Sequence, residues 1–189
     1  MPSNTEALAQ VLIDQFAKDG ITSEIVRLVD LDVKPGVKSD EGKGDAWPGV
    51  RTKILAADIL VVATPTWLGQ HSSVCQRAIE RLDAMLSETK EDGRPILFDK
   101  VAGVVVTGNE DGAHHIVACV CQALMDCGFT IPAHCWTYWH LGPGPGPDYT
   151  DDVKGHEWSD RTGRNAARNL VAAAKALKAN PLPKQETGE

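Results

Sequence analysis

Residues 58–64 are Asp58-Ile59-Leu60-Val61-Val62-Ala63-Thr64, and Pro65 follows them. The run is apolar between its two ends and has the length of one β-strand. Continuous apolar runs of this length are typical of strands covered on both faces, as in parallel sheets. Residues 101–106, Val101-Ala102-Gly103-Val104-Val105-Val106, form a second run of the same kind. The two runs predict buried strands of a parallel sheet.

Helical patterns lie on either side of these strands. Apolar residues recur at three- and four-residue spacing over residues 3–19, 72–88 and 158–178 and again after Gly112, and a short helix is predicted over 50–57. Ser3 and Glu6 have the spacing of a capping box, and Gly20 is a suitable helix end. Strands that alternate with helices predict an α/β fold, a doubly wound parallel sheet in a three-layer α/β/α sandwich.

Two further strands are predicted. Residues 22–31 contain Ile25, Val26, Leu28 and Val29, and their imperfect alternation indicates a position near a sheet edge. Residues 129–138 predict the last strand. Between the elements, residues 32–50 form a long surface loop anchored by Trp47-Pro48, and residues 142–147 form an irregular Gly-Pro loop.

Composition excludes several classes of protein. The 189 residues suit one domain, and a net charge of -7 disfavours binding to nucleic acid. No stretch approaches the roughly 20 apolar residues of a membrane span, and the N-terminus lacks the features of a signal peptide, so we expect a cytoplasmic protein. The five cysteines include no C-x-x-C pair. We therefore expect core cysteines rather than a disulfide framework or a metal site.

Ligands of such sheets bind beyond the carboxyl ends of the strands, so the segments that follow strands are informative. Ser3-Asn4-Thr5 opens the first helix and offers hydroxyl groups, backbone N–H groups and the positive end of the helix dipole. These groups suit a phosphate, although for this segment taken alone plain N-capping is the favoured interpretation.

The other two segments suit a flat ring. Pro65-Thr66-Trp67-Leu68-Gly69-Gln70-His71 combines aromatic, apolar and amide groups, although Trp67 is also suited to packing. Thr107-Gly108-Asn109-Glu110-Asp111-Gly112 has two glycines that permit a close backbone approach, although an ordinary turn has the same composition.

Together these segments resemble the flavodoxin-like proteins of the NADPH-dependent FMN reductase family. The resemblance rests on Ser3-Asn4-Thr5, on the Pro-Thr-Trp-x-Gly pattern of residues 65–69 with Arg81-Leu82-Asp83 beyond it, and on Thr107-Gly108-Asn109 before Gly112. It covers residues 3 to 139. It implies that Ser3, Asn4 and Thr5 hold the phosphate of FMN, and that the isoalloxazine ring contacts Pro65, Thr66, Trp67, Leu68, Gly69, Thr107, Gly108, Asn109 and Gly112.

The resemblance also implies an activity. An FMN-dependent NAD(P)H oxidoreductase would pass a hydride from NADPH or NADH to FMN and then to a quinone, a flavin or a similar small acceptor, and would need no catalytic side chain. We expect residues 1–179 to form the FMN-binding domain, residues 180–189 a disordered tail, and the chain a homodimer or homotetramer. The alternatives are an electron carrier without nicotinamide turnover and an inactive remnant.

One departure from the family concerns the N-terminus. The family begins with an apolar strand before the phosphate loop, but Met1-Pro2 occupies that place here. In the strand order 2-1-3-4-5 that strand is central, so its loss would leave residues 22–31 and 58–64 without a shared partner. We therefore expect either a start upstream of Met1 or a defective fragment.

Several other side chains have two interpretations. His114 lies in the first turn of a helix, where it could contact flavin or substrate. His71 could touch the nicotinamide or be solvated, and Glu110-Asp111 is interpreted as a solvated helix start. The last strand carries three aromatic side chains, Trp136, Tyr138 and Trp139. They could cover the flavin ring, form a subunit contact or pack the strand.

Overall fold

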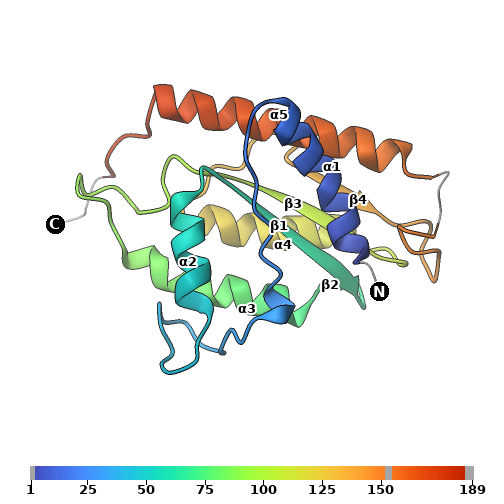
Figure 1. The fold of residues 1–189 in the computed structure, drawn as a ribbon, viewed down its shortest axis with the longest axis horizontal. Helices are drawn as coiled ribbons and strands as arrows, with labels where there is room; N and C mark the ends of the chain where they lie inside the picture. Colours follow the sequence, from blue (N-terminus) through green and yellow to red (C-terminus); the bar gives the residue numbers. More distant parts are fainter. Residues whose placement is uncertain (1–2, 152–154, 186–189) are drawn as a thin grey trace.

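The computed structural model describes residues 3–151 and 155–185 (Figure 1). Met1-Pro2 lies outside these residues. The helices are α1 (Asn4–Lys18), α2 (Trp47–Ala56), α3 (Ser73–Leu82), α4 (Ala113–Asp126) and α5 (Glu157–Ala179). The strands are β1 (Ile59–Trp67), β2 (Gln70–His71), β3 (Val101–Thr107) and β4 (Trp136–Trp139). Two 3-10 turns, η1 (Leu28–Asp30) and η2 (Asp83–Ser87), complete the elements.

The strands form one sheet in the order β2-β1-β3-β4. β1 runs parallel to β3 from the pair Ile59↔Val101 to the pair Pro65↔Thr107, and β4 runs parallel to β3 on its other side. The short strand β2 pairs antiparallel with the end of β1. The predicted α/β fold with a parallel sheet is therefore confirmed, with β2 as an antiparallel addition.

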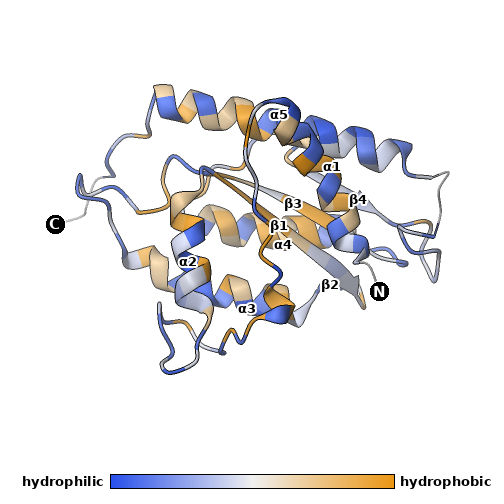
Figure 2. Ribbon diagram, in the orientation of Figure 1, coloured by the Kyte–Doolittle hydropathy of each residue, from blue (hydrophilic) through white to orange (hydrophobic). Residues whose placement is uncertain are grey.

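Helices cover both faces of this sheet. α1 and α5 pack against each other on one face, whereas α3 and α4 lie on the other (Figure 1). β3 and the first half of β1 are hydrophobic, and the outward surfaces of the helices are mostly polar (Figure 2). All seven residues of β3 are buried, as its apolar run predicts. Among the described residues, none of the helices combines the length and the hydropathy of a membrane span.

The strand predicted over residues 22–31 is wrong. Residues 21–27 belong to no strand or helix, and η1 follows them. Ile21, Val26 and Leu28 still pack against the core. A strand needs a neighbour for its backbone hydrogen bonds, and the described strands pair only in the order given above. Apolar content alone therefore does not make this segment a strand.

β1 also differs from its prediction in two respects. Residues 59–62 are half-buried and Ala63 is exposed, because β2 pairs with β1 only at Thr66 and Trp67. The strand also continues beyond Pro65 to Trp67, where a two-residue turn leads into β2. Proline lacks the N–H group of a ladder bond, but the edge of a sheet tolerates this.

A buried ion pair fixes the long loop of residues 32–46. The side chains of Arg81, on α3, and Asp45 have no exposed area, and Nη2 of Arg81 lies 2.7 Å from Oδ2 of Asp45. The guanidinium also donates to the backbone oxygens of Lys34 and Lys38 at 2.8 to 3.1 Å. The Arg81 guanidinium carbon lies 5.6 Å from the centre of the buried Trp47 ring. α3 therefore holds the loop in place through one side chain.

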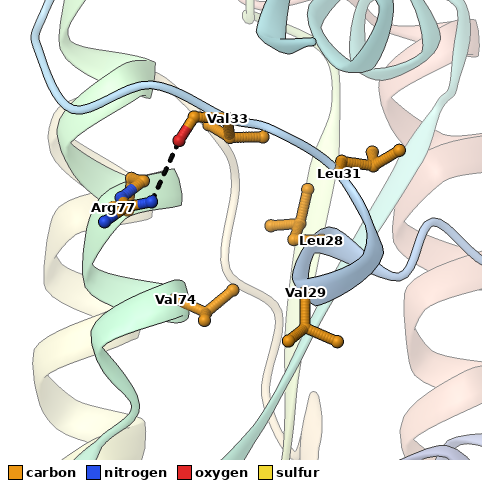
Figure 3. Close-up of a pocket in the computed structure, with 6 residues that line it drawn as sticks. All are labelled: Leu28, Val29, Leu31, Val33, Val74 and Arg77. Atoms are coloured by element: carbon orange, nitrogen blue, oxygen red, sulfur yellow. Dashed lines mark hydrogen bonds between the residues drawn. The ribbon is translucent and has the colours of Figure 1, made fainter. Parts of the chain in front are cut away.

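A hollow lies between residues 28–33 and α3 (Figure 3). Arg77 borders it and donates to the backbone oxygen of Val33 at 3.0 Å. The remaining lining residues are apolar: Leu28, Val29, Leu31, Val33 and Val74. None of them belongs to the segments that follow the strands, so the hollow is separate from the predicted ligand site.

Because of the ion pair between Arg81 and Asp45, the free energy of unfolding should vary with pH in the acidic range. Burial alone would raise the pKa of Asp45, but hydrogen bonds from Arg81 and from the backbone N–H groups of Glu41, Trp47 and Lys34 hold the pKa well below its usual range. The pKa of Asp45 is lower in the folded state than in the unfolded state, where it is about 3.9, so the ionised carboxylate stabilises the fold at pH values above this pKa. The stabilisation is lost as the pH falls from there towards the folded-state pKa. We expect the free energy of unfolding to decrease from about pH 5 downwards.

Urea unfolding at several pH values measures this effect. Asp45→Asn should flatten the acid dependence, whereas the same change at the exposed Asp14 should leave it as in the wild type. Equal slopes for wild type and Asp45→Asn would contradict the prediction.

The C-terminal end is only partly described. The backbone N–H of Leu182 donates to Asp99 at 2.9 Å, and the backbone oxygen of Leu182 accepts from Arg94 at 3.1 Å. Residues 186–189 lie outside the described residues. The disordered tail of residues 180–189 stays a prediction.

Candidate functional site

The three segments singled out in the sequence meet at the carboxyl end of the sheet. They are residues 3–5, 65–71 and 107–112, and we refer to them as the three rim loops. The hydroxyl groups of Thr5 and Thr107 are 2.7 Å apart, so the start of α1 touches the end of β3. Ser3 accepts a hydrogen bond from the backbone N–H of Glu6 at 3.2 Å, so N-capping is present. The cap leaves the hydroxyl of Ser3 close to the first N–H groups of the helix, which lack partners within it.

The second and third rim loops also touch each other. The backbone N–H of Gly69 donates to Oε1 of Glu110 at 3.3 Å. Gly112 has a φ of +119° and lies so close to Gly69 that a Cβ atom on Gly112 would be 2.7 Å from the Cα atom of Gly69. This contact requires glycine at position 112 for both its conformation and its size. All three rim loops therefore form one continuous surface.

Thr66 carries a buried hydroxyl directly beneath this surface. Its side chain is 3% exposed, and its hydroxyl oxygen has no hydrogen-bond partner among the described residues. Gly108 approaches it so closely that a Cβ atom there would lie 2.7 Å from the Cβ atom of Thr66. A buried hydroxyl without a partner costs about 1–3 kcal/mol, which a bound polar group would recover. Thr66 is therefore suited to contact a ligand.

The turn between β1 and β2 presents apolar side chains to solvent. Trp67 is 62% exposed and Leu68 is 92% exposed. Leu68 and Gly69 have positive φ values of 51° and 73°, as in the two-residue turns preferred by β-hairpins. Large exposed apolar side chains at one site are typical of surfaces that bind a ligand or another subunit.

His114 lies beside the aromatic side chains of β4. Its ring is 5.1 Å from the Tyr138 ring and 5.5 Å from the Trp136 ring, edge-on to both. Tyr138 and Trp136 are half-buried on the strand, whereas Trp139 is buried. The structure thus places His114 next to the third rim loop but packed towards β4, and Trp139 has a packing role.

Sequence reasoning missed two contacts of the rim. Glu110 was interpreted as part of a solvated helix start, but its carboxylate joins two rim loops through Gly69. The Gly-Pro loop also reaches the site, because the backbone N–H of Gly146 donates to the backbone oxygen of Asn109 at 2.6 Å. His71, at the end of the second rim loop, is half-buried, and its Nε2 atom is 2.7 Å from Oε1 of Gln76. No sequence pattern pointed to the contacts of Glu110 and Gly146.

Within residues 3–151 and 155–185, no group of three or more His, Cys, Asp or Glu side chains is arranged to hold a metal ion. Four of the five cysteines are buried and Cys119 is half-buried, and all are free thiols. The core role predicted for the cysteines is therefore confirmed for the four buried ones.

Comparison with known proteins identifies relatives over most of the chain. The model of the family described as NADPH-dependent FMN reductase matches residues 1–141. The chain is 34% identical over 191 residues to the 8-demethyl-8-aminoriboflavin-5'-phosphate synthase of Streptomyces davaonensis, covering 95% of this chain and 74% of that protein. It is 36% identical over 184 residues to a Mycobacterium bovis protein named divalent metal cation transporter MntH, covering 94% of this chain. The chain spans only 27% of that relative's length.

A solved structure is also similar. RosB, in complex with the intermediate 8-demethyl-8-formylriboflavin-5'-phosphate, superposes with a TM-score of 0.88 at 30% identity. The similarity covers 96% of this chain and 76% of RosB.

The rim loops fit a flavin mononucleotide. The unpartnered hydroxyl of Thr66 can bond a polar edge of the ring, and the exposed Trp67 offers an apolar surface. The N-terminus of α1 supplies N–H groups for a phosphate. The first rim loop touches the third through Thr5 and Thr107, and the third touches the second through Glu110 and Gly69, so the donors for the phosphate and the groups for the ring lie on one continuous surface.

Proposed function

Because the chain belongs to the NADPH-dependent FMN reductase family, we propose that it binds FMN across the three rim loops and catalyses an NAD(P)H-dependent reduction. The acceptor would be a quinone, a flavin or a similar small molecule. The observation that carries this proposal is the buried hydroxyl of Thr66, which has no hydrogen-bond partner in the described part of the chain and lies where the second and third rim loops meet.

The bound flavin would supply the redox chemistry, taking a hydride from the nicotinamide and releasing electrons to the acceptor. The chain's own residues would orient the reactants. Ser3, Asn4 and Thr5 would hold the phosphate, and Thr66 would fix the ring from the second rim loop. The N–H group of Gly108 donates to the backbone oxygen of Trp139, so the N–H groups of residues 109–112 would be the ones that stabilise negative charge on the ring. Trp67 and Leu68 would shield one side of the ring from water.

The exposed tip at Trp67 and Leu68 also supports a homodimer or homotetramer. A second subunit would cover these side chains and remove apolar surface from water. Size-exclusion chromatography with light scattering measures the subunit number.

A second candidate function treats the flavin as substrate. The similarity to RosB, at a TM-score of 0.88 and 30% identity, favours it, since that structure contains a modified riboflavin-5'-phosphate as an intermediate. In this alternative, the rim loops would bind FMN reversibly and the chain would alter its ring. Mass spectrometry of recovered flavin distinguishes the two functions, because a reductase returns FMN unchanged.

An FMN titration followed by anaerobic NADPH oxidation with a quinone tests the proposal. We expect one FMN per chain and acceptor-dependent NADPH oxidation. Thr66→Val removes only the hydroxyl, and we expect about tenfold weaker FMN binding, whereas the same change at Thr52, exposed on α2, should have no effect.

FMN binding without NADPH oxidation would instead identify an electron carrier. Absence of FMN binding by the folded chain would contradict the proposal and favour an inactive remnant.

A further inference from the structure

The segment that follows the Gly-Pro loop meets the start of α1. Two donors of Thr150 bond the same atom of Asn4, the side-chain oxygen Oδ1. The backbone N–H of Thr150 lies 3.0 Å from it, and the hydroxyl oxygen of Thr150 lies 2.7 Å from it. Asn4 belongs to the first rim loop, which would hold the phosphate.

These two bonds determine which end of the Asn4 amide faces the site. A backbone N–H can only donate, so the Asn4 atom opposite it must be the oxygen. An amide oxygen has two lone pairs, and Thr150 uses both. The amide nitrogen, with its two N–H donors, must then point away from Thr150. Asn4 therefore has hydrogen-bond donors available for an anion.

Thr150 is held by a buried neighbour. Tyr149 is 6% exposed, its hydroxyl donates to Asp160 at 2.8 Å, and its ring stacks on that of His156 at 4.0 Å. Burial, together with the hydrogen bond to Asp160, raises the pKa of Tyr149, so its hydroxyl stays protonated and keeps donating. The indole N–H of Trp139 donates to the backbone oxygen of Pro147 at 3.4 Å. These contacts fix the position of Thr150.

We propose that Thr150 is a positioning residue for the FMN phosphate, acting through the orientation of the Asn4 amide. This inference rests on the proposed function. It gives a role to the segment around Thr150, for which the sequence suggested none. Thr150 is flanked closely by Asp148 and Asp151, whose negative charges disfavour a direct contact with phosphate. Its effect therefore passes through Asn4.

Comparing FMN with riboflavin isolates this effect, because the two ligands differ only in the phosphate. Thr150→Val removes the hydroxyl donor but keeps the backbone N–H and the shape of the side chain. We expect FMN to bind about tenfold more weakly to Thr150→Val, with riboflavin affinity unchanged. Thr150→Ser keeps the hydroxyl and should bind FMN as tightly as the wild type does. In the Asn4→Ala background, Thr150→Val should cause no further loss.

Fluorescence titration of both flavins distinguishes the outcomes. An equal loss of FMN and riboflavin affinity would indicate a merely structural role for Thr150 and overturn the inference. Unchanged FMN affinity in Thr150→Val would also overturn it while leaving the proposed function intact. If the wild type binds neither flavin, the proposed function itself fails, and the inference fails with it.

Discussion

Replacement of Arg81 by methionine should lower the free energy of unfolding by about 3–5 kcal/mol, the usual cost of breaking a buried ion pair. The change would leave the carboxylate of Asp45 buried without its charged partner. It would also remove the donors to the backbone oxygens of Lys34 and Lys38. A domain has a total stability of about 5–15 kcal/mol, so much of the stability would be lost.

Urea unfolding of Arg81→Met measures this loss, with Arg77→Met as the matched control. Arg77 lies one turn earlier on α3, is exposed, and donates to the backbone oxygen of Val33. Its replacement should cost about 1 kcal/mol. If the two variants were equally stable, the ion pair would not hold the loop of residues 32–46 in the way described.

The second large effect is expected at Gly112. Alanine at this position would adopt a φ of +119° with strain and would place its Cβ atom 2.7 Å from the Cα atom of Gly69. The second and third rim loops would then have to separate. Backbone strain and overpacking each cost about 1–3 kcal/mol, so FMN affinity should fall about a hundredfold.

Flavin fluorescence titration of Gly112→Ala measures the affinity, and thermal unfolding checks that the variant is folded. Gly93→Ala is the matched control, because Gly93 has a φ of +83° but nothing within 4 Å of a Cβ atom. Gly93→Ala should lower the free energy of unfolding without weakening FMN binding. Wild-type affinity in Gly112→Ala would show that contact between these two rim loops is not needed for binding.

The sequence predicted the elements whose signals are local. β3 is buried along its whole length, as its apolar run indicates, and α1 begins after Ser3, as the capping pattern indicates. Residues 22–31 were predicted wrongly, because a strand depends on a partner that its own residues do not specify. The burial of β1 was overestimated for a related reason, since it depends on the neighbour at its edge.

The site could be predicted in outline but not in its connections. The rule that ligands bind beyond the carboxyl ends of strands identified the rim loops, and the structure brings them together. The bond between Gly69 and Glu110 depends on tertiary packing, as does the contact of Thr150 with Asn4. Asn4 and Thr150 are 146 positions apart in the sequence, and no local pattern relates them.

A crystal structure of the protein at saturating FMN tests the central claim most directly. The account predicts a single flavin that contacts Thr5, Thr66 and Asn109, with the phosphate at the start of α1 and the ring beside Trp67. A flavin bound away from these residues, or held by one rim loop alone, would contradict it.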